Sequence, residues 1–257
     1  MNPKPPLYRD YIESNFKDYR EYQRRALSQE PEMTKFLKKL LPCWLNTELP
    51  YRLLDIGCGN GNTCFHLNSQ HPHWYYVGVD VVSGLIEDGR HLFSNIENLR
   101  LEVADAHYLE SFSEEPFDVV LMWRVLQGLE NWKQALRSAY SITKPGGHLI
   151  ISTLLNDADV DLSIIMRDYS ASGDIKDVTL RIFSEAQFRA YCMELGVQTV
   201  TFEKFNMPIA LPRPERGLNT YTVDLMEGNK IQLAGGALVD HWKIAHIIKG
   251  DLTDANN

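Results

Sequence analysis

The spacing of hydrophobic positions changes along this chain near residue 50. Between Thr34 and Leu45, apolar side chains recur every three or four residues, which predicts an amphipathic helix. Beyond residue 50, short apolar runs alternate with amphipathic stretches. The runs predict strands and the stretches predict helices. The strands are expected at 52–57, 74–79, 99–104, 117–123, 148–155, 197–205 and 242–248, and the helices at 62–70, 83–94, 132–142 and 184–195.

Strands that alternate with helices in units of about 25 to 40 residues predict right-handed crossovers and a parallel sheet covered on both faces. The expected fold class is therefore α/β with an open sheet. Two segments interrupt the alternation, at 156–182 and 206–240. The second contains a predicted hairpin that pairs 220–225 with 230–233 across Glu227-Gly228-Asn229. The aromatic and aliphatic content of both segments favours ordered coverings over disordered loops.

Composition excludes several classes of protein. The 257 residues contain 26 Lys and Arg against 34 Asp and Glu, a formal net charge of −8, which argues against a general nucleic-acid binder. No stretch approaches the ~20 apolar residues of a membrane helix, and the first residues have no apolar core of a secretory signal. A cytoplasmic location is expected. The four cysteines form no CxxC pair, so neither a metal site nor a disulfide framework is expected.

The segment 53–61, Leu-Leu-Asp-Ile-Gly-Cys-Gly-Asn-Gly, carries the strongest chemical signal. A strand ends there, glycines turn the backbone, and a helix begins. A dinucleotide motif would need a third glycine at position 62, which is Asn62. Asp55 would repel a pyrophosphate but attract a cation, and Asp80 ends the next strand, where a ribose diol could bind. These residues predict a pocket for a ribose-bearing cation with an ammonium group.

The chain resembles the class I S-adenosylmethionine-dependent methyltransferases over 51–155. Four elements carry the resemblance, and they are the loop at 55–61, Asp80, Ala104-Asp105-Ala106, and Phe117-Asp118-Val119-Val120 leading to Lys144-Pro145-Gly146-Gly147. After the fourth strand, Trp123-Arg124-Val125-Leu126-Gln127-Gly128 lacks the Asn-Pro pair of base-amine methyltransferases. It is similar instead to the small-molecule branch.

The resemblance implies a Rossmann-like, seven-stranded, mostly parallel sheet with an antiparallel last strand. It implies a helical lid at 1–50 and a methyltransferase domain at 51–257, with substrate-covering insertions at 156–182 and 206–240. It also implies S-adenosylmethionine as cofactor and S-adenosylhomocysteine as product. The residues that would hold the cofactor are Asp55, Gly57, Gly59, Gly61, Asp80, Val81, Asp105, Ala106 and Trp123.

No residue stands out as a general base. Arg124, His107 and Tyr19 are the candidates for a catalytic role, each with a structural alternative. Arg124 could instead pair with Glu130, and His107 could serve packing. The tyrosines Tyr8, Tyr11, Tyr19 and Tyr22 could form a lid face or a merely buried helix face, and Arg167 and Arg181 could hold an anion or lie in solvent.

The leading functional hypothesis is methyl transfer to oxygen or nitrogen of a small metabolite. Its acceptor pocket would be lined by Met166, Tyr169, Met207, Tyr221 and Met226. Two alternatives remain open. A protein or peptide methyltransferase predicts an open acidic groove, and an inactive cofactor-binding partner subunit predicts a broad apolar patch. A homodimer is possible, and RNA as substrate is disfavoured by the charge.

Overall fold

The computed structural model describes residues 7–110, 112, 115–214, 220–225, 230–235 and 238–250. The helices are α1 (Tyr8–Ser14), α2 (Phe16–Ser28), α3 (Glu32–Trp44), α4 (Asn62–Gln70), α5 (Ser83–Leu92), the 3-10 turn η1 (Leu126–Gly128), α6 (Trp132–Ile142) and α7 (Glu185–Glu194). The strands are β1 (Arg52–Ile56), β2 (Tyr75–Asp80), β3 (Leu99–Val103), β4 (Phe117–Trp123), β5 (Thr143–Asn156), β6 (Leu162–Arg167), β7 (Asp177–Ser184), β8 (Val200–Lys204), β9 (Thr220–Asp224), β10 (Lys230–Ala234), β11 (Leu238–Val239) and β12 (Trp242–Ile248).

The central sheet has the strand order β3-β2-β1-β4-β5-β12-β8. Its first five strands pair in parallel, and β12 runs antiparallel to both β5 and β8. The prediction of a mostly parallel α/β sheet with an antiparallel last strand is confirmed. The inserted hairpin of β6 and β7 joins the end of β5, which brings the sheet to nine strands within the described residues.

Successive residues of the central strands bury into opposite layers. Leu54 and Ile56 of β1 pack in the core cluster that contains side chains of α6 and α7. Leu53, the residue before Leu54, packs in the cluster that contains Leu37 and Leu41 of α3 and side chains of α4. All of these side chains are fully buried. The strands therefore read as nearly continuous apolar runs, because helices cover both faces of the sheet.

Most predicted boundaries agree with the structure. β4, α4 and α6 begin and end at the predicted residues. The Ser184 side chain accepts the Gln187 N–H and thereby caps α7. The strand predicted at 148–155 begins earlier in the structure, since β5 already starts at Thr143. Its pairing with β4 shifts register there and Gly146 has φ 71°, so a bulge accommodates the glycines within the strand.

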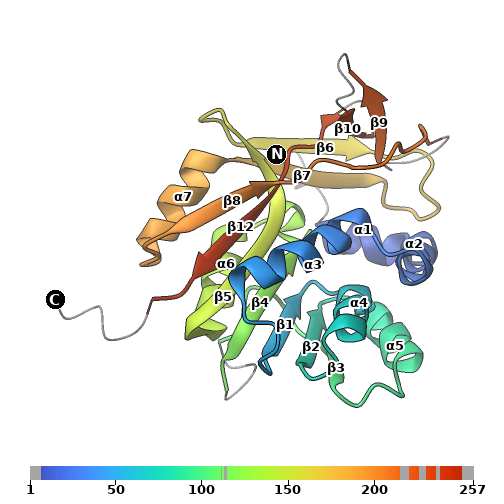
Figure 1. Cartoon of the computed structure of the whole chain (residues 1–257). Helices are drawn as coiled ribbons and strands as arrows, with labels where there is room; N and C mark the ends of the chain where they lie inside the picture. The colour runs from blue at the N-terminus through green and yellow to red at the C-terminus, as the bar shows by residue number, and fades with distance from the viewer. Residues whose placement is uncertain are drawn as a thin grey trace.

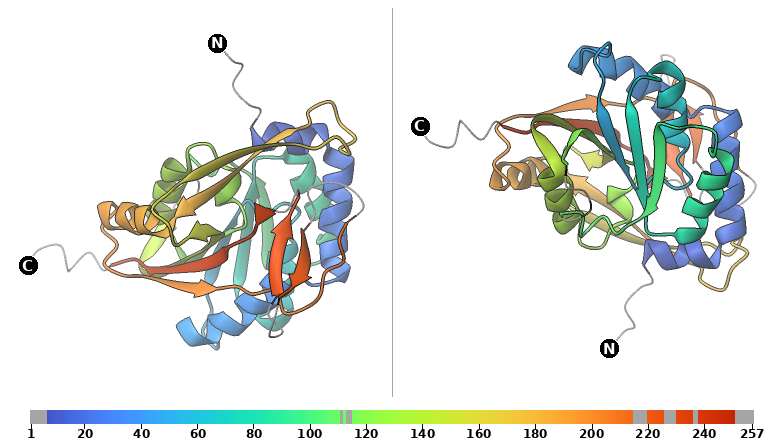
Figure 2. Two further views of the ribbon diagram at one scale, coloured as in Figure 1. Left: turned by 90° about the horizontal axis from the view of Figure 1, so that it is seen from above. Right: turned by 90° about the horizontal axis from the view of Figure 1, so that it is seen from below.

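The predicted hairpin is confirmed as the antiparallel pair of β9 and β10, while its turn at 226–229 lies outside the described residues. In Figure 1, α1 and α2 lie between the strands β6, β7 and β9 above and the helices α4 and α5 below. Figure 2 shows the small sheet of β9 and β10 over the central sheet, seen from above. Within the part of the chain that is described, no helix is both long and apolar enough to cross a membrane.

Candidate active site

The glycine-rich loop after β1 is bent by residues of positive φ. Gly57 has φ 74° and Gly59 has φ 59°, values that side chains with a Cβ rarely adopt. A Cβ on Gly57 would lie 2.5 Å from Val125 Cγ2, and one on Gly59 would lie 2.8 Å from Gln23 Nε2. Gly61, the third predicted glycine, has φ 88° and precedes α4. The loop is therefore held between α2 on one side and the segment after β4 on the other.

Asp55 lies beneath this loop at the end of β1. Its side chain is buried, and its Oδ1 atom has no hydrogen-bond partner among the described residues. Burial, together with the nearby charge of Asp80, raises the pKa of Asp55 to about 8. Asp55 is therefore largely protonated at neutral pH when no cation is near.

Asp80, at the end of β2, connects two loops. Its Oδ2 accepts the Gly59 N–H and its Oδ1 accepts the Val82 N–H, each at 2.9 Å. The Val81 backbone also donates to this carboxylate, and because a carboxylate has about four lone-pair positions, acceptor capacity is left for a ligand. Val81, the next residue, packs against the cluster of Ile12, Val82 and Leu85, as do Phe16 and Tyr19 of α2. The lid helices, as we call α1 and α2, therefore lie directly over the predicted ribose and adenine positions.

Asp105 and Ala106 follow β3. The Asp105 carboxylate accepts both the backbone N–H of His107, at 2.9 Å, and its ring Nδ1, at 2.6 Å. Burial would raise the pKa of Asp105, but these hydrogen bonds lower it below the usual value. Ala106 packs against the core of the α6 side. His107 is thus paired with Asp105, and it does not line the cavity described next.

A cavity of about 510 Å³, here called the inner cavity, opens between the lid helices, the glycine-rich loop, η1, the β6–β7 hairpin and β12. Six aromatic side chains contribute to its wall, and they are Tyr8, Tyr11, Tyr19, Tyr22, Trp123 and Trp242. Of the residues predicted from the sequence, Gly57, Trp123, Arg124, Tyr19 and Met166 line it. Trp123 Nε1 and Gln127 Oε1 are buried there without a partner among the described residues.

Arg124 has an unusual backbone. Among the described residues it is the only non-glycine residue with positive φ, at 62°, a conformation that costs about 1–3 kcal/mol. Ser152 fixes it by accepting the Arg124 N–H at its Oγ, 2.8 Å away, and the Gln127 side chain donates to the Arg124 carbonyl. This backbone directs the side chain away from the sheet and into the inner cavity.

The Arg124 guanidinium is surrounded by protein, yet it keeps accessible surface because it faces the cavity. Its Nη1 donates to the Tyr22 hydroxyl at 2.9 Å, and its Cζ lies 5.4 Å from the centre of the Trp242 ring. The alternative pairing with Glu130 is not seen, since Glu130 instead acts electrostatically on Arg181. Arg124 is thus held by neutral rings, and no carboxylate forms an ion pair with it in the described residues.

The other residues expected at the acceptor are mostly elsewhere. Tyr169 is 83% exposed, while Met207 and Tyr221 pack outside the inner cavity. Met226 lies outside the described residues. Arg167 forms a surface ion pair with Asp177. Sequence reasoning missed Gln23, Asp168 and Asp240, which line the cavity; no motif surrounds them, and only the tertiary fold brings them together.

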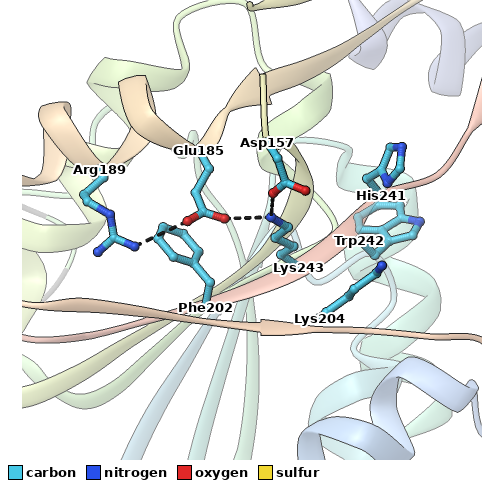
Figure 3. A pocket seen from close by; sticks show the side chains of 8 residues that line it. All are labelled: Asp157, Glu185, Arg189, Phe202, Lys204, His241, Trp242 and Lys243. Carbon is cyan, nitrogen blue, oxygen red and sulfur yellow. Dashed lines mark hydrogen bonds and ion pairs between the residues drawn. The ribbon is translucent and has the colours of Figure 1, made fainter. Parts of the chain in front are cut away.

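A second, smaller hollow lies on the other side of Trp242 and is shown in Figure 3. This outer hollow, of about 290 Å³, is lined by Asp157, Glu185, Arg189, Phe202, Lys204, His241, Trp242 and Lys243. Four of its charged side chains pair with one another. Lys243 contacts both Asp157 and Glu185, and Arg189 contacts Glu185 at 3.3 Å. Such a network stabilises the junction of α7 and β12, and it leaves few polar atoms free for a ligand.

Residues 19–201 match a family model described as a methyltransferase domain. The malonyl-[acyl-carrier protein] O-methyltransferase of Bacillus cereus is 25% identical over 174 residues, which are 66% of this chain and 63% of the relative. The ubiquinone/menaquinone biosynthesis C-methyltransferase UbiE of Ruegeria sp. is 30% identical over 120 residues, 44% of this chain and 48% of the relative.

Other relatives are much longer. The hybrid PKS-NRPS synthetase iliA of Neonectria sp. is 28% identical over 120 residues, 44% of this chain but 3% of the relative. Among solved structures, the 1,6-didemethyltoxoflavin-N1-methyltransferase of Burkholderia thailandensis gives a TM-score of 0.57 at 17% identity and covers 96% of this chain and 93% of its own. The YcgJ protein of Bacillus subtilis gives 0.53 at 17%, covering 78% and 92%. These structural likenesses show the same fold.

The residues around the loop fit S-adenosylmethionine. Asp80 retains acceptor capacity for a diol, and the orphaned Asp55 Oδ1 lies beside it under the loop. The Asn60 amide nitrogen on the same loop is also buried without a partner among the described residues. Buried polar atoms are nearly always paired, so a cluster of unpaired ones at a strand end is typical of a binding site. Among the described residues, no group of three His, Cys, Asp or Glu side chains could hold a metal ion.

Proposed function

Because the chain belongs to the methyltransferase domain family and is an S-adenosylmethionine-dependent methyltransferase, we propose that it methylates oxygen or nitrogen of a small molecule bound in the inner cavity. One observation carries this proposal. The cavity is roofed by the lid helices and walled by both inserted segments, and it extends to Gly57 and Cys58 of the loop. Its volume of about 510 Å³ suits a small organic ligand.

The cofactor would bind along the carboxyl ends of β1, β2 and β3. We assign the ribose to Asp80, the adenine to Val81, Asp105 and Ala106, and the methionine part to the loop of Gly57, Gly59 and Gly61, with Trp123 beside it. Asp55 would act on the ammonium group from below the loop, through its charge or a bridging water. The helices α1 and α2 would move to admit the cofactor, since Phe16 and Tyr19 now pack against the same cluster as Val81.

When bound, S-adenosylmethionine supplies a methyl group on a positively charged sulfur. The chain's own residues would then position the acceptor in line with that methyl group and exclude water. Arg124 projects into the cavity from the end of β4, next to the loop that would hold the methionine part. We propose that its guanidinium anchors an electron-rich group of the acceptor, and that Tyr19 closes over it from the lid.

The names of the relatives do not select the acceptor atom, because they include O-, C- and N-methyltransferases. Enclosure favours a small molecule over the alternative of a protein or peptide, which would need an open groove. The polar groups on the cavity wall, among them Arg124, favour an active enzyme over an inactive partner subunit.

Calorimetric titration of S-adenosylhomocysteine tests the cofactor site. We expect micromolar binding to the wild type, loss of binding in Asp80→Ala and unchanged binding in Arg137→Ala, a control on the exposed side of α6. A screen of metabolites for methylation, followed by mass spectrometry, then tests the acceptor. Methylation of proteins but of no small molecule would contradict the proposal, and absence of binding to the wild type would contradict the cofactor assignment.

A further inference from the structure

Methyl transfer to a hydroxyl requires a group that removes its proton. The described wall of the inner cavity contains no histidine, and its carboxylates are Asp18, Asp168 and Asp240. Its tyrosines are poor bases at neutral pH, because a phenol is protonated there. Burial raises the pKa of Tyr8 and Tyr19 further.

Two of the three carboxylates have structural tasks. Asp168 is buried, and its Oδ1 accepts the N–H and the hydroxyl of Ser170 at 2.9 and 2.6 Å, while its Oδ2 accepts the Tyr11 hydroxyl at 3.1 Å. It thereby ties α1 to the β6–β7 hairpin. Asp18 is exposed on α2 and accepts the Ser172 N–H at 3.3 Å. Neither is a good candidate for accepting a proton from a ligand.

Asp240, between β11 and β12, differs from both. Its backbone N–H donates to the Gln232 carbonyl at 3.0 Å, and its carboxylate accepts from the Gln232 side chain at 3.3 Å and from the Trp242 side chain. These protein donors fix the carboxylate and leave some of its lone pairs for the cavity. Arg124 is close enough to act on it electrostatically. A base and a cation thus share one wall.

The remaining walls indicate what would bind there. Tyr11, Tyr22, Trp123 and Trp242 offer flat faces, and Met33 and Met166 add polarisable sulfur atoms. A flat, conjugated ring fits such a lining, and its hydroxyl could lie between Arg124 and Asp240. As the hydroxyl ionises, the Arg124 guanidinium would stabilise the charge that develops on oxygen.

We propose that the acceptor is an aromatic compound with an acidic hydroxyl, and that Asp240 is the catalytic base that removes its proton. Both assignments rest on the proposed function. The hydroxyl proton passes to an Asp240 oxygen and later to solvent. The electron pair of the oxygen forms the new bond to the methyl carbon, and the pair of the broken carbon–sulfur bond stays on sulfur. No oxidant or further reactant is needed.

The ionisation of Asp240 suits this role. Burial raises the pKa of Asp240 to about 6, against the opposing effects of Trp242, Arg124 and Gln232. The groups that face it are therefore one cation from the end of β4, an amide from β10 and an indole from β12. His241 lies instead in the outer hollow, beyond Trp242 (Figure 3). A carboxylate with a pKa near neutrality is ionised at pH 7 yet still basic enough to take a proton.

Two probe acceptors test the proposal. Phenol, like a tyrosine side chain, stays protonated at about pH 8, whereas 4-nitrophenol is ionised there and needs no base. We expect Asp240→Asn to slow the methylation of phenol by about 10²-fold and that of 4-nitrophenol by less than about threefold. Asp224→Asn, on the exposed strand β9, makes the same substitution outside the cavity and should change neither rate.

A second measurement does not depend on turnover. In the complex with S-adenosylhomocysteine, the ¹³Cγ resonance of Asp240, identified by its loss in Asp240→Asn, should titrate near pH 6. A midpoint in the ordinary aspartate range, an equal loss of rate on both phenols, or an unchanged rate on phenol would each overturn the role of Asp240.

Failure of the acceptor class is separable from failure of the proposed function. If the wild-type complex with S-adenosylhomocysteine binds neither phenol, or if the wild type supplied with S-adenosylmethionine methylates neither phenol, the aromatic acceptor is overturned while the cofactor site stands. If S-adenosylhomocysteine itself does not bind, the proposed function fails first.

Discussion

The inner cavity and the outer hollow lie on opposite sides of one side chain, Trp242, and their polar groups are arranged in opposite ways. In the outer hollow, Lys243 is only 12% exposed and contacts two carboxylates. In the inner cavity, Arg124 contacts only rings and a phenol hydroxyl, and Gln127 Oε1 has no partner among the described residues. One hollow satisfies its own charges, and the other keeps donors and acceptors available.

This difference separates a structural network from a binding site more clearly than charge content does. The outer hollow has more ionic groups, yet their mutual ion pairs leave little free energy to be gained from a ligand. The inner cavity retains strain at Arg124 and unpaired buried atoms, features that cluster at functional sites. The following predictions contrast residues in and around the inner cavity, its loop and its lid with residues of the outer hollow.

The largest contrast concerns the two arginines and catalysis. Arg124→Ala should reduce the rate of methylation of the acceptor by about 10²-fold or more, because it removes the cation that acts on Asp240 at the proposed position of developing charge. Arg189→Ala, in the outer hollow, should keep the wild-type rate. Steady-state kinetics measures the rates of both variants. Their affinity for S-adenosylhomocysteine checks that each variant is folded. Equal losses would remove the distinction between the two sites.

The next contrast concerns carboxylates and the pH dependence of stability. Burial raises the pKa of Asp55 to about 8, so the folded state binds an extra proton and loses stability as pH rises from about 4 to 8. In the outer hollow, the hydrogen bond from Lys243 lowers the pKa of Asp157. Its contribution is therefore present above the unfolded pKa of about 4 and is lost as pH falls below it.

Urea denaturation between pH 4 and 8 measures the two slopes. Asp55→Asn should flatten the decline in the free energy of unfolding, by on the order of a few kcal/mol at pH 8. Asp157→Asn should leave that decline intact and alter only the acidic end of the curve. A wild-type stability that rises steadily toward pH 8 would contradict the burial of an uncompensated Asp55.

The cofactor side of the inner cavity could be predicted from the sequence because it is local. Asp55, Gly57 and Gly59 are adjacent in one loop, and Asp80 ends the neighbouring strand. Parallel strands bring such ends together wherever the sheet forms. The alternation of apolar runs likewise predicted β4, α4 and α6 residue by residue, since burial on both faces leaves a continuous apolar pattern.

The acceptor side could not be predicted in the same way. Asp240, Asp168 and Gln23 come from three distant segments, and each is an ordinary polar residue in its own sequence context. Tyr169 was expected in the pocket from its aromatic character, but it lies at the exposed tip after β6. The register of the β6–β7 hairpin decides which side chains of this segment face the inner cavity, and composition does not encode that register.

A smaller contrast concerns backbone conformation. At position 124, with φ 62°, glycine should be more stable than alanine by about 1 kcal/mol, because only the Cβ of alanine is strained there. At position 189, inside α7, glycine should be less stable than alanine by about 1 kcal/mol. Thermal unfolding of Arg124→Gly, Arg124→Ala, Arg189→Gly and Arg189→Ala measures both differences. The same sign at both positions would show that Arg124 is not held in a left-handed backbone.

The smallest contrast concerns two carboxylates that each bind two cations, one that holds the lid and one between fixed elements. Asp88 of α5 is buried and binds Arg20 and Arg24 of the lid helix α2. Burial alone would raise the pKa of Asp88, but the hydrogen bonds from Arg24 and Arg20 lower it. Glu185 of α7 binds Lys243 and Arg189, neither of which belongs to the lid.

Asp88→Asn should therefore speed the dissociation of S-adenosylhomocysteine by about fivefold, since loss of about 1 kcal/mol from the closed lid corresponds to that factor. Glu185→Gln removes a comparable charge pair from the outer hollow and should leave the dissociation rate unchanged while lowering stability. Stopped-flow displacement measures both rates. If Glu185→Gln speeds release as much as Asp88→Asn does, release follows overall stability, and the arginine pairs of α2 do not hold the lid over the cofactor.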